Sequence, residues 1–196
     1  MIRREIFQKV CRYAQARDIV FTPREQEIIA SLTTHKVLPP YTILMEQGKP
    51  VKWLYFLNSG IARLYRIHKG TDHTLGIISI NDFISTPLYL FSGAISPCGL
   101  ESLTEVDVLV WDKPRVAAMK EQIPRMYDME LAVMDRLLNW VQDNQIDAVC
   151  MTAEERYQKI MTEQPEVIRQ IPLKYVASLL GIHQDSLSRI RKALTK

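Results

Sequence analysis

Residues 173–190 read Leu-Lys-Tyr-Val-Ala-Ser-Leu-Leu-Gly-Ile-His-Gln-Asp-Ser-Leu-Ser-Arg-Ile, a pattern that predicts two short helices joined by a tight turn. Pro172 suits the start of the first helix, and Gly181 stands where a sharp turn needs a positive φ. The inward-facing positions of both helices carry small or apolar residues, namely Val176, Ala177, Leu180, Ile182, Leu187 and Ile190. Because these positions agree in residue type and in spacing, we predict a helix-turn-helix.

The second helix, predicted at about 184–194, exposes a polar and basic face. Its outward positions are Gln184, Asp185, Ser186, Ser188, Arg189 and Lys192. In the major groove of DNA, arginine pairs with guanine, glutamine with adenine, and aspartate or serine with cytosine. We therefore expect Gln184, Asp185, Ser188 and Arg189 to read bases. Lys174, Arg191 and Lys192 are expected close to phosphates. A helical hairpin that only packs, with its charges solvated, is the alternative.

The charge of the chain is distributed unevenly. The formal net charge of the 196 residues is only +3, but residues 169–196 carry six lysines and arginines against one aspartate. The remainder of the chain is therefore slightly acidic. A basic end on a near-neutral body favours a nucleic-acid-binding end, and a solvated basic helix is again the alternative.

The composition excludes several classes of protein. With 47% hydrophobic and 24% charged residues, the chain is expected to be globular and not disordered. No apolar run reaches the roughly 18 residues of a membrane-spanning helix, and we recognise no secretory signal, so we expect a cytoplasmic protein without a membrane partner. Cys11, Cys98 and Cys150 are too far apart for a zinc or disulfide pattern, and we predict no metal site. No catalytic motif is present, so we do not expect an enzyme.

Residues 36–112 consist of short β-rich runs separated by turn residues. We predict strands at Tyr41–Met45, Trp53–Leu57, Ile61–Ile67, Leu75–Ile80 and Val106–Trp111. Runs of this length, bounded by residues such as Lys69 and Gly70, are typical of a small antiparallel barrel or sandwich. The intervals leave no room for the helices of a βαβ enzyme core.

From Lys113 onward the apolar residues follow a helical period. They recur at intervals of four and three residues, at Tyr127, Leu131, Met134, Leu138 and Val141 and then at Gln145 and Ala148. This a/d pattern predicts a long helix that pairs with its own copy in a parallel dimer, or one that packs on its own barrel. Thr152 and Glu155 form a capping box, which starts a new helix, as Thr22 and Glu25 do for a short helix near the N-terminus. We therefore predict domains at 1–150, with the dimerisation helix at about 113–150, and at 151–196.

Three segments together resemble the Crp/Fnr family, which includes the cyclic AMP receptor protein. They are Ile43-Leu44-x-x-Gln47-Gly48, Tyr55-Phe56-Leu57-x-Ser59-Gly60 with Arg63, and the helix-turn-helix. The resemblance implies an α+β protein with an N-terminal double-stranded β-helix (a jelly-roll barrel like those that bind cyclic nucleotides), a long dimerisation helix and a C-terminal helix-turn-helix. It also implies a homodimeric transcriptional regulator that binds a pseudo-palindromic operator in double-stranded DNA and acts with RNA polymerase.

The sequence departs from the family in the nucleotide pocket. Cyclic AMP binders of the family hold the ribose with Glu and the phosphate with Arg, where this chain has Thr86 and Ser96. Residues 71–112 contain no Lys or Arg and six acidic residues, which opposes phosphate binding. We therefore predict no cofactor and no control by cyclic AMP. The candidate ligand pocket comprises Ser85, Thr86, Ser96, Pro97 and Cys98, and it holds an unknown small-molecule effector, an apolar one near Leu88, Tyr89 and Phe91, or none.

A second departure is at the C-terminus. The family continues into a β-hairpin wing, whereas this sequence ends at Lys196, so we expect no phosphate contacts from a wing. Gln184 also stands where the cyclic AMP receptor type has Arg. We therefore do not expect this chain to bind the operator sequence of the cyclic AMP receptor. A ligand-binding or protein-interaction module that has lost specific DNA binding is the rival interpretation. The operator, the effector and the direction of control do not follow from the sequence.

Overall fold

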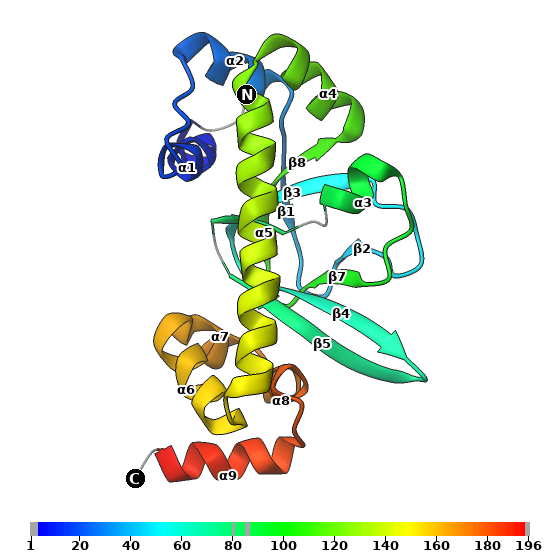
Figure 1. The fold of residues 1–196 in the computed structure, drawn as a ribbon, viewed down its shortest axis with the longest axis vertical. Coiled ribbons are helices and arrows are strands. Elements are labelled where there is room, and N and C mark those ends of the chain that lie inside the picture. Colours follow the sequence, from blue (N-terminus) through cyan, green and yellow to red (C-terminus); the bar gives the residue numbers. More distant parts are fainter. Residues whose placement is uncertain (1–3, 80, 85–86, 195–196) are drawn as a thin grey trace.

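Residues 34–112 form two four-stranded sheets in the computed structural model, which describes residues 4–79, 81–84 and 87–194. The first sheet has the order β1-β8-β3-β6, with β1 (Thr34–Leu38), β8 (Val106–Asp112), β3 (Trp53–Ser59) and β6 (Asp82–Phe83). The second has the order β2-β7-β4-β5, with β2 (Ile43–Met45), β7 (Gly99–Ser102), β4 (Ala62–His68) and β5 (Thr71–Ile78). All the pairings are antiparallel, which confirms the predicted barrel (Figure 1).

Apolar side chains fill the space between the two sheets. Strand β8 illustrates the arrangement, because successive side chains of a strand point to opposite faces. Val108 and Val110 belong to the buried cluster inside the barrel, which also contains Leu57 and Leu100. Leu109 and its neighbour Trp111 belong instead to a second cluster, on the outer face of the first sheet. Both faces of β8 are therefore buried.

Helices that precede and follow the barrel strands in the sequence cover that outer face. They are α1 (Arg4–Gln15), α2 (Pro23–Ser31) and α4 (Lys113–Gln122). Helix α2 begins at the predicted capping box, in which the Thr22 hydroxyl accepts a hydrogen bond from the Glu25 amide and the Glu25 carboxylate accepts one from the Thr22 amide. Helix α1 was not expected, although Val10 and Ala14 are four residues apart and both are buried. A short helix, α3 (Pro87–Ser92), precedes β7.

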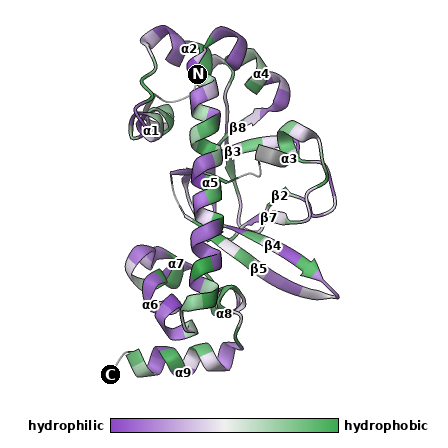
Figure 2. Ribbon diagram, viewed as in Figure 1, coloured by the Kyte–Doolittle hydropathy of each residue, from purple (hydrophilic) through white to green (hydrophobic). Residues whose placement is uncertain are grey.

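Helix α5 (Arg125–Cys150) extends over 26 residues and runs along the length of the molecule (Figure 1). Its Met129 and Val133 are buried against the outer cluster of the barrel. Further along, the Trp140 ring lies so close to Gly76 of β5 that a methyl group on Gly76 would overlap it. Glycine at position 76 thus lets the long helix approach the second sheet. Figure 2 shows hydrophilic and hydrophobic residues alternating along α5.

Four helices follow after a break at Met151 and Thr152, where the predicted capping box with Glu155 is present. They are α6 (Ala153–Glu163), α7 (Pro165–Gln170), α8 (Leu173–Leu180) and α9 (Gln184–Leu194). Their buried residues do not form a core of their own. Ile61, Ile77 and Leu103 of the barrel join the same cluster as Tyr157 and Val176 of the helices. The C-terminal helices are therefore packed on the barrel.

Several element boundaries differ from those predicted from the sequence. Strand β5 begins at Thr71, directly after a turn in which Lys69 and Gly70 both have positive φ. Strands β1, β6 and β7 were not predicted, because they are short and each carries a charged residue. Residue 80, the predicted end of one strand, lies outside the described residues. Within the described part of the chain, no helix combines the length and the apolar composition needed to cross a membrane.

Candidate nucleic-acid interface

Helices α8 and α9 have the geometry predicted for a helix-turn-helix. Gly181 ends α8 in the left-handed region, with φ of 70° and ψ of 27°. The Ile182 amide then donates a 3.0 Å hydrogen bond to the Ala177 carbonyl, which returns the chain across the end of α8. Val176 and Leu187 are completely buried, with 0% exposed surface each. The turn and the buried side chains thus hold α9 in a fixed direction relative to α8.

The outward face of α9 lies at one end of the molecule, where the helix crosses the direction of α5 (Figure 1). Gln184, Asp185, Arg189 and Lys192 are exposed, while Ser186 and Ser188 are half-buried. The Ser188 hydroxyl donates a 3.0 Å hydrogen bond to the Gln184 carbonyl of its own helix, so it is left to act as an acceptor. The side chains chosen from the sequence thus share one surface.

Lys174 is set apart from this group. It is exposed on α8, and its ammonium lies 4.7 Å from the centre of the Tyr175 ring. Its charge also helps to lower the pKa of Asp72 in β5, after the larger effect of Arg63 on that carboxyl. Lys174 therefore lies near the contact between α8 and strand β5 of the barrel, and it is also exposed to solvent.

The predicted dimerisation residues form an exposed stripe on α5. The exposed fractions are 58% for Tyr127, 68% for Leu131, 65% for Leu138 and 48% for Val141, while Met134 is half-buried. The face of α5 that packs on the barrel is a different one, centred on Met129 and Val133. The stripe therefore does not pack on its own barrel, which was the alternative expected from the sequence.

The predicted ligand-pocket residues are only partly described. Ser85 and Thr86 lie outside the described residues, while Pro97 is exposed and Cys98 is half-buried. The buried Ser96 hydroxyl donates a 2.9 Å hydrogen bond to the Cys98 carbonyl and accepts one from the Cys98 amide. The Ser96 backbone is also hydrogen-bonded, to Gly48 and Lys49. The hydroxyl of Ser96 thus stabilises a turn.

The apolar alternative for a ligand involves Tyr89 and Phe91 of α3, together with Leu88. Tyr89 and Phe91 pack against the cluster inside the barrel. Phe91 also lines an apolar cavity between the barrel and the outer helices, with a volume of about 50 Å³. Because ligand sites usually measure about 300–1,000 Å³, this cavity is too small for an organic effector. The Leu88 side chain lies outside the described part of the chain.

A larger cleft lies between α1, α5, α6 and the edge of the barrel. Its volume is about 910 Å³, and Tyr13, Asp82, Arg136, Trp140 and Lys159 are among the residues that line it. Arg136 and Asp82 form an ion pair at 3.1 Å, yet burial raises the pKa of Asp82. Burial likewise raises the pKa of Tyr13 to about 12. Of the predicted pocket residues that the structure describes, namely Ser96, Pro97 and Cys98, none lines this cleft.

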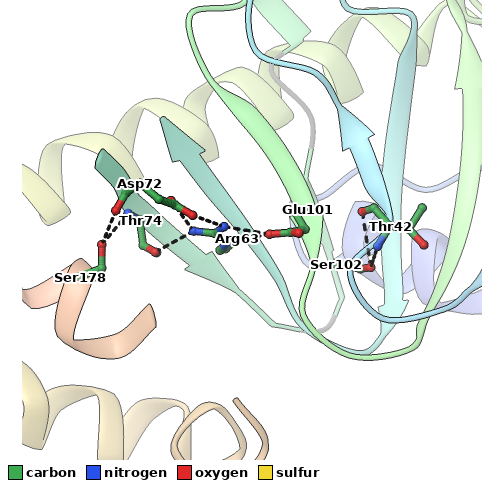
Figure 3. Close-up of polar contacts among 7 residues, drawn as sticks. All are labelled: Thr42, Arg63, Asp72, Thr74, Glu101, Ser102 and Ser178. Atoms are coloured by element: carbon green, nitrogen blue, oxygen red, sulfur yellow. Dashed lines mark hydrogen bonds and ion pairs between the residues drawn. The ribbon is translucent and has the colours of Figure 1, made fainter. Parts of the chain in front are cut away.

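Sequence reasoning missed a cluster of charges around Arg63 in β4. The guanidinium is buried and donates hydrogen bonds to Asp72, Thr74 and Glu101 (Figure 3). These hydrogen bonds hold the pKa of Asp72 below its usual range. The sequence marked Arg63 only as part of a strand motif, because its partners are distant along the chain. Among the described residues, no three His, Cys, Asp or Glu side chains gather as a metal site would require.

The sequence and the fold were compared with known proteins. Residues 35–122 match the family model of the cyclic nucleotide-binding domain. A comparison with curated protein sequences finds no significant match. Among solved structures, a protein assigned to the Crp/Fnr family of transcriptional regulators from Eubacterium rectale matches with a TM-score of 0.70 and 14% sequence identity, over 94% of this chain and 88% of that chain.

Two further solved structures show the same similarity. FixK2 from Bradyrhizobium japonicum has a TM-score of 0.69 and 16% identity, over 83% of this chain and 84% of its own. The c-di-GMP-responsive regulator CLP from Xanthomonas campestris has a TM-score of 0.69 and 16% identity, over 89% of this chain and 92% of its own. Residues 35–122 are therefore similar to cyclic nucleotide-binding domains, and the chain has the overall fold of the Crp/Fnr-family regulators.

Proposed function

We propose that the chain is a DNA-binding transcriptional regulator of the Crp/Fnr type. The observation that carries the proposal is the outward face of α9, where Gln184, Arg189 and Lys192 are exposed together at one end of the molecule. A helix that presents such side chains can enter the major groove and read base edges. In this role Gln184, Asp185 and Arg189 contact bases, and Lys192 contacts phosphate. The regulator acts in the cytoplasm.

The regulator is proposed to act as a parallel homodimer. The exposed stripe on α5 supports this, because Leu131, Leu138 and Val141 would be covered by the same stripe of a second copy. Two recognition helices related by a two-fold axis then require a pseudo-palindromic operator, with half-sites one turn of DNA or roughly 34 Å apart. A second copy is favoured over another partner because the a/d spacing of the stripe matches a parallel coiled coil.

Cyclic AMP is not proposed as the effector. Ser96, at the position where the family's binders have arginine, uses its hydroxyl within a turn. The buried guanidinium of Arg63 is engaged by Asp72 and Glu101. The arginine of the family's binders is therefore absent at this position, Arg63 is not free to replace it, and an uncompensated buried charge is costly. Binding to the operator is proposed to occur without added nucleotide.

The experiment is a selection of bound sequences from a random pool of double-stranded DNA, at about 150 mM salt and without added ligand. An enriched inverted repeat is expected. The affinity of the enriched site should fall steeply as salt is raised, because phosphate contacts release counterions. If no sequence is enriched, and none is enriched after cell extract is added, the proposal is wrong and a protein-interaction module is favoured.

A further inference from the structure

The Arg63 side chain is buried between two strands of the barrel and one helix of the helix-turn-helix. Its two terminal nitrogens each donate a 2.7 Å hydrogen bond to an oxygen of Asp72, and Nε donates one of 2.9 Å to Glu101 (Figure 3). Only 4% of Arg63 is exposed. On its helix side, the guanidinium lies 4.3 Å from the centre of the Tyr175 ring of α8. The cation is therefore shared between the barrel and the DNA-binding helices.

A second set of hydrogen bonds crosses the same joint. Strand β5 lies at the edge of its sheet, where backbone groups need partners from outside the sheet. The Ser178 hydroxyl of α8 accepts a 2.9 Å hydrogen bond from the Thr74 amide and donates one of 3.4 Å to the Asp72 carbonyl (Figure 3). Helix α8 is thus attached to β5 in one register along the strand.

This joint helps to determine where α9 points relative to α5, alongside the direct ion pair between Asp147 of α5 and Lys159 of α6. The Trp140 ring of α5 lies against Gly76 of β5, α8 is attached to the same strand, and Gly181 and Ile182 fix α9 to α8. In a dimer that pairs through α5, the separation of the two recognition helices therefore depends on the attachment of α8 to β5. Changing that attachment would change the half-site spacing of the DNA that fits.

A buried ion cluster is a poor way to gain stability but a good way to fix geometry. Apolar residues of similar volume often stabilise a fold as well as or better than a buried ion pair. Charged partners, in contrast, tolerate few alternative arrangements, because a misplaced partner leaves a buried charge unpaired. We propose that Arg63 is a positioning residue for DNA recognition, which sets the spacing of the two recognition helices without a bound ligand. This inference rests on the proposed function.

The test uses the full chain with Arg63→Met, and Arg66→Met as the matched control. Arg66 lies on the same strand but is exposed. Each protein is measured on the selected operator and on operators with one or two base pairs inserted between the half-sites. Wild type and Arg66→Met should bind one spacing, whereas Arg63→Met should bind it about tenfold more weakly and should accept several spacings. Affinity for non-specific DNA should stay the same.

A second variant keeps the test possible if the first variant does not fold. If Arg63→Met leaves Glu101 unpaired and does not fold, the double variant Arg63→Met/Glu101→Gln removes that charge and is used instead. Hydrogen exchange should be faster at the Thr74 amide and along α8 in either variant, and unchanged in the barrel interior. The inference is overturned if a folded, dimeric variant keeps the wild-type spacing preference, whether or not α8 is loosened. A different result separates this inference from the proposed function. If the wild-type protein selects no DNA, but hydrogen exchange at α8 is faster in the Arg63 variants, the proposed function and the role of Arg63 in DNA recognition are both wrong. The attachment of α8 to β5 through Arg63 would still be supported.

Discussion

The barrel and the C-terminal helices use their polar side chains in opposite ways. In the barrel, Arg63 is satisfied by Asp72 and Glu101, and Ser96 by a neighbouring backbone. On α9, Gln184 and Arg189 are exposed on a helix that is itself rigidly held. A polar group that the fold has already satisfied is not available to a ligand, whereas an exposed one on a fixed helix is. The comparison supports the proposal that α9 contacts DNA and that these barrel side chains do not hold a nucleotide.

The largest effect is expected from disrupting the stripe on α5, because the proposed binding of two α9 helices to one operator depends on the dimer. The double variant Leu131→Glu/Leu138→Glu places two charges where a second copy should pack, and it should weaken dimerisation about 100-fold, or about 2.8 kcal/mol. Sedimentation velocity across a concentration series measures this. Asn139→Glu, on another face of the same helix, is the control and should remain dimeric. A monomeric wild-type protein would contradict the prediction.

Removing one base-reading side chain should have the next largest effect. Arg189→Ala should weaken binding to the selected operator by about 1–3 kcal/mol and should relax the base preference at one position. Its thermal stability should stay within about 0.5 kcal/mol of wild type, because the side chain is exposed. Fluorescence anisotropy on operator and mismatched DNA provides the affinities. Arg169→Ala, exposed on α7, serves as the control. Equal losses for both variants would argue against a specific role for Arg189.

A smaller effect is expected at the turn of the helix-turn-helix. Gly181 has a φ of 70°, and a methyl group there would meet no other atom within 4 Å. Gly181→Ala should therefore lower the free energy of unfolding only by the backbone cost of the left-handed region, about 1–2 kcal/mol. Gly181→Asn should cost less, because asparagine tolerates this region better. Urea unfolding monitored by circular dichroism compares the two. A loss from Gly181→Ala no greater than that from Gly181→Asn would contradict this reason.

No effect is expected from cyclic AMP, and this is the sharpest test of the barrel side of the comparison. A ligand at 100 times its dissociation constant stabilises the native state by about 2.7 kcal/mol, which a thermal melt detects readily. We expect the melting temperature to stay unchanged at millimolar cyclic AMP. A melting temperature that rises with the concentration of cyclic AMP would show that other groups, such as backbone amides, hold the phosphate. The prediction that cyclic AMP does not bind would then be wrong.

Local signals in the sequence predicted local structure well. Both capping boxes, Thr22 with Glu25 and Thr152 with Glu155, are present as expected, because each involves residues only three positions apart. The left-handed Gly181 is also present, for the same reason. The barrel, the long helix and the helix-turn-helix followed from periodicity and from the family resemblance.

Features that depend on distant partners were missed. Arg63 and Tyr175 come together only through the packing of α8 on the barrel, so no pattern near either residue signals their contact. The backbone of Ser96 likewise pairs with Gly48 and Lys49, which are distant along the chain. Helix α1 had a usable signal, since Val10 and Ala14 are spaced by four residues, but its many charged residues obscured it.

The apolar cluster that Ile61, Ile77 and Leu103 share with the C-terminal helices limits how freely this architecture can be recombined. In a chimera, a helix-turn-helix taken from another regulator would meet barrel side chains shaped for Tyr157 and Val176. Conversely, the C-terminal helices expressed alone would expose the apolar surface that the barrel now covers. The barrel and the C-terminal helices are thus separate in sequence but not interchangeable modules, and changes on one side of the boundary must be matched on the other.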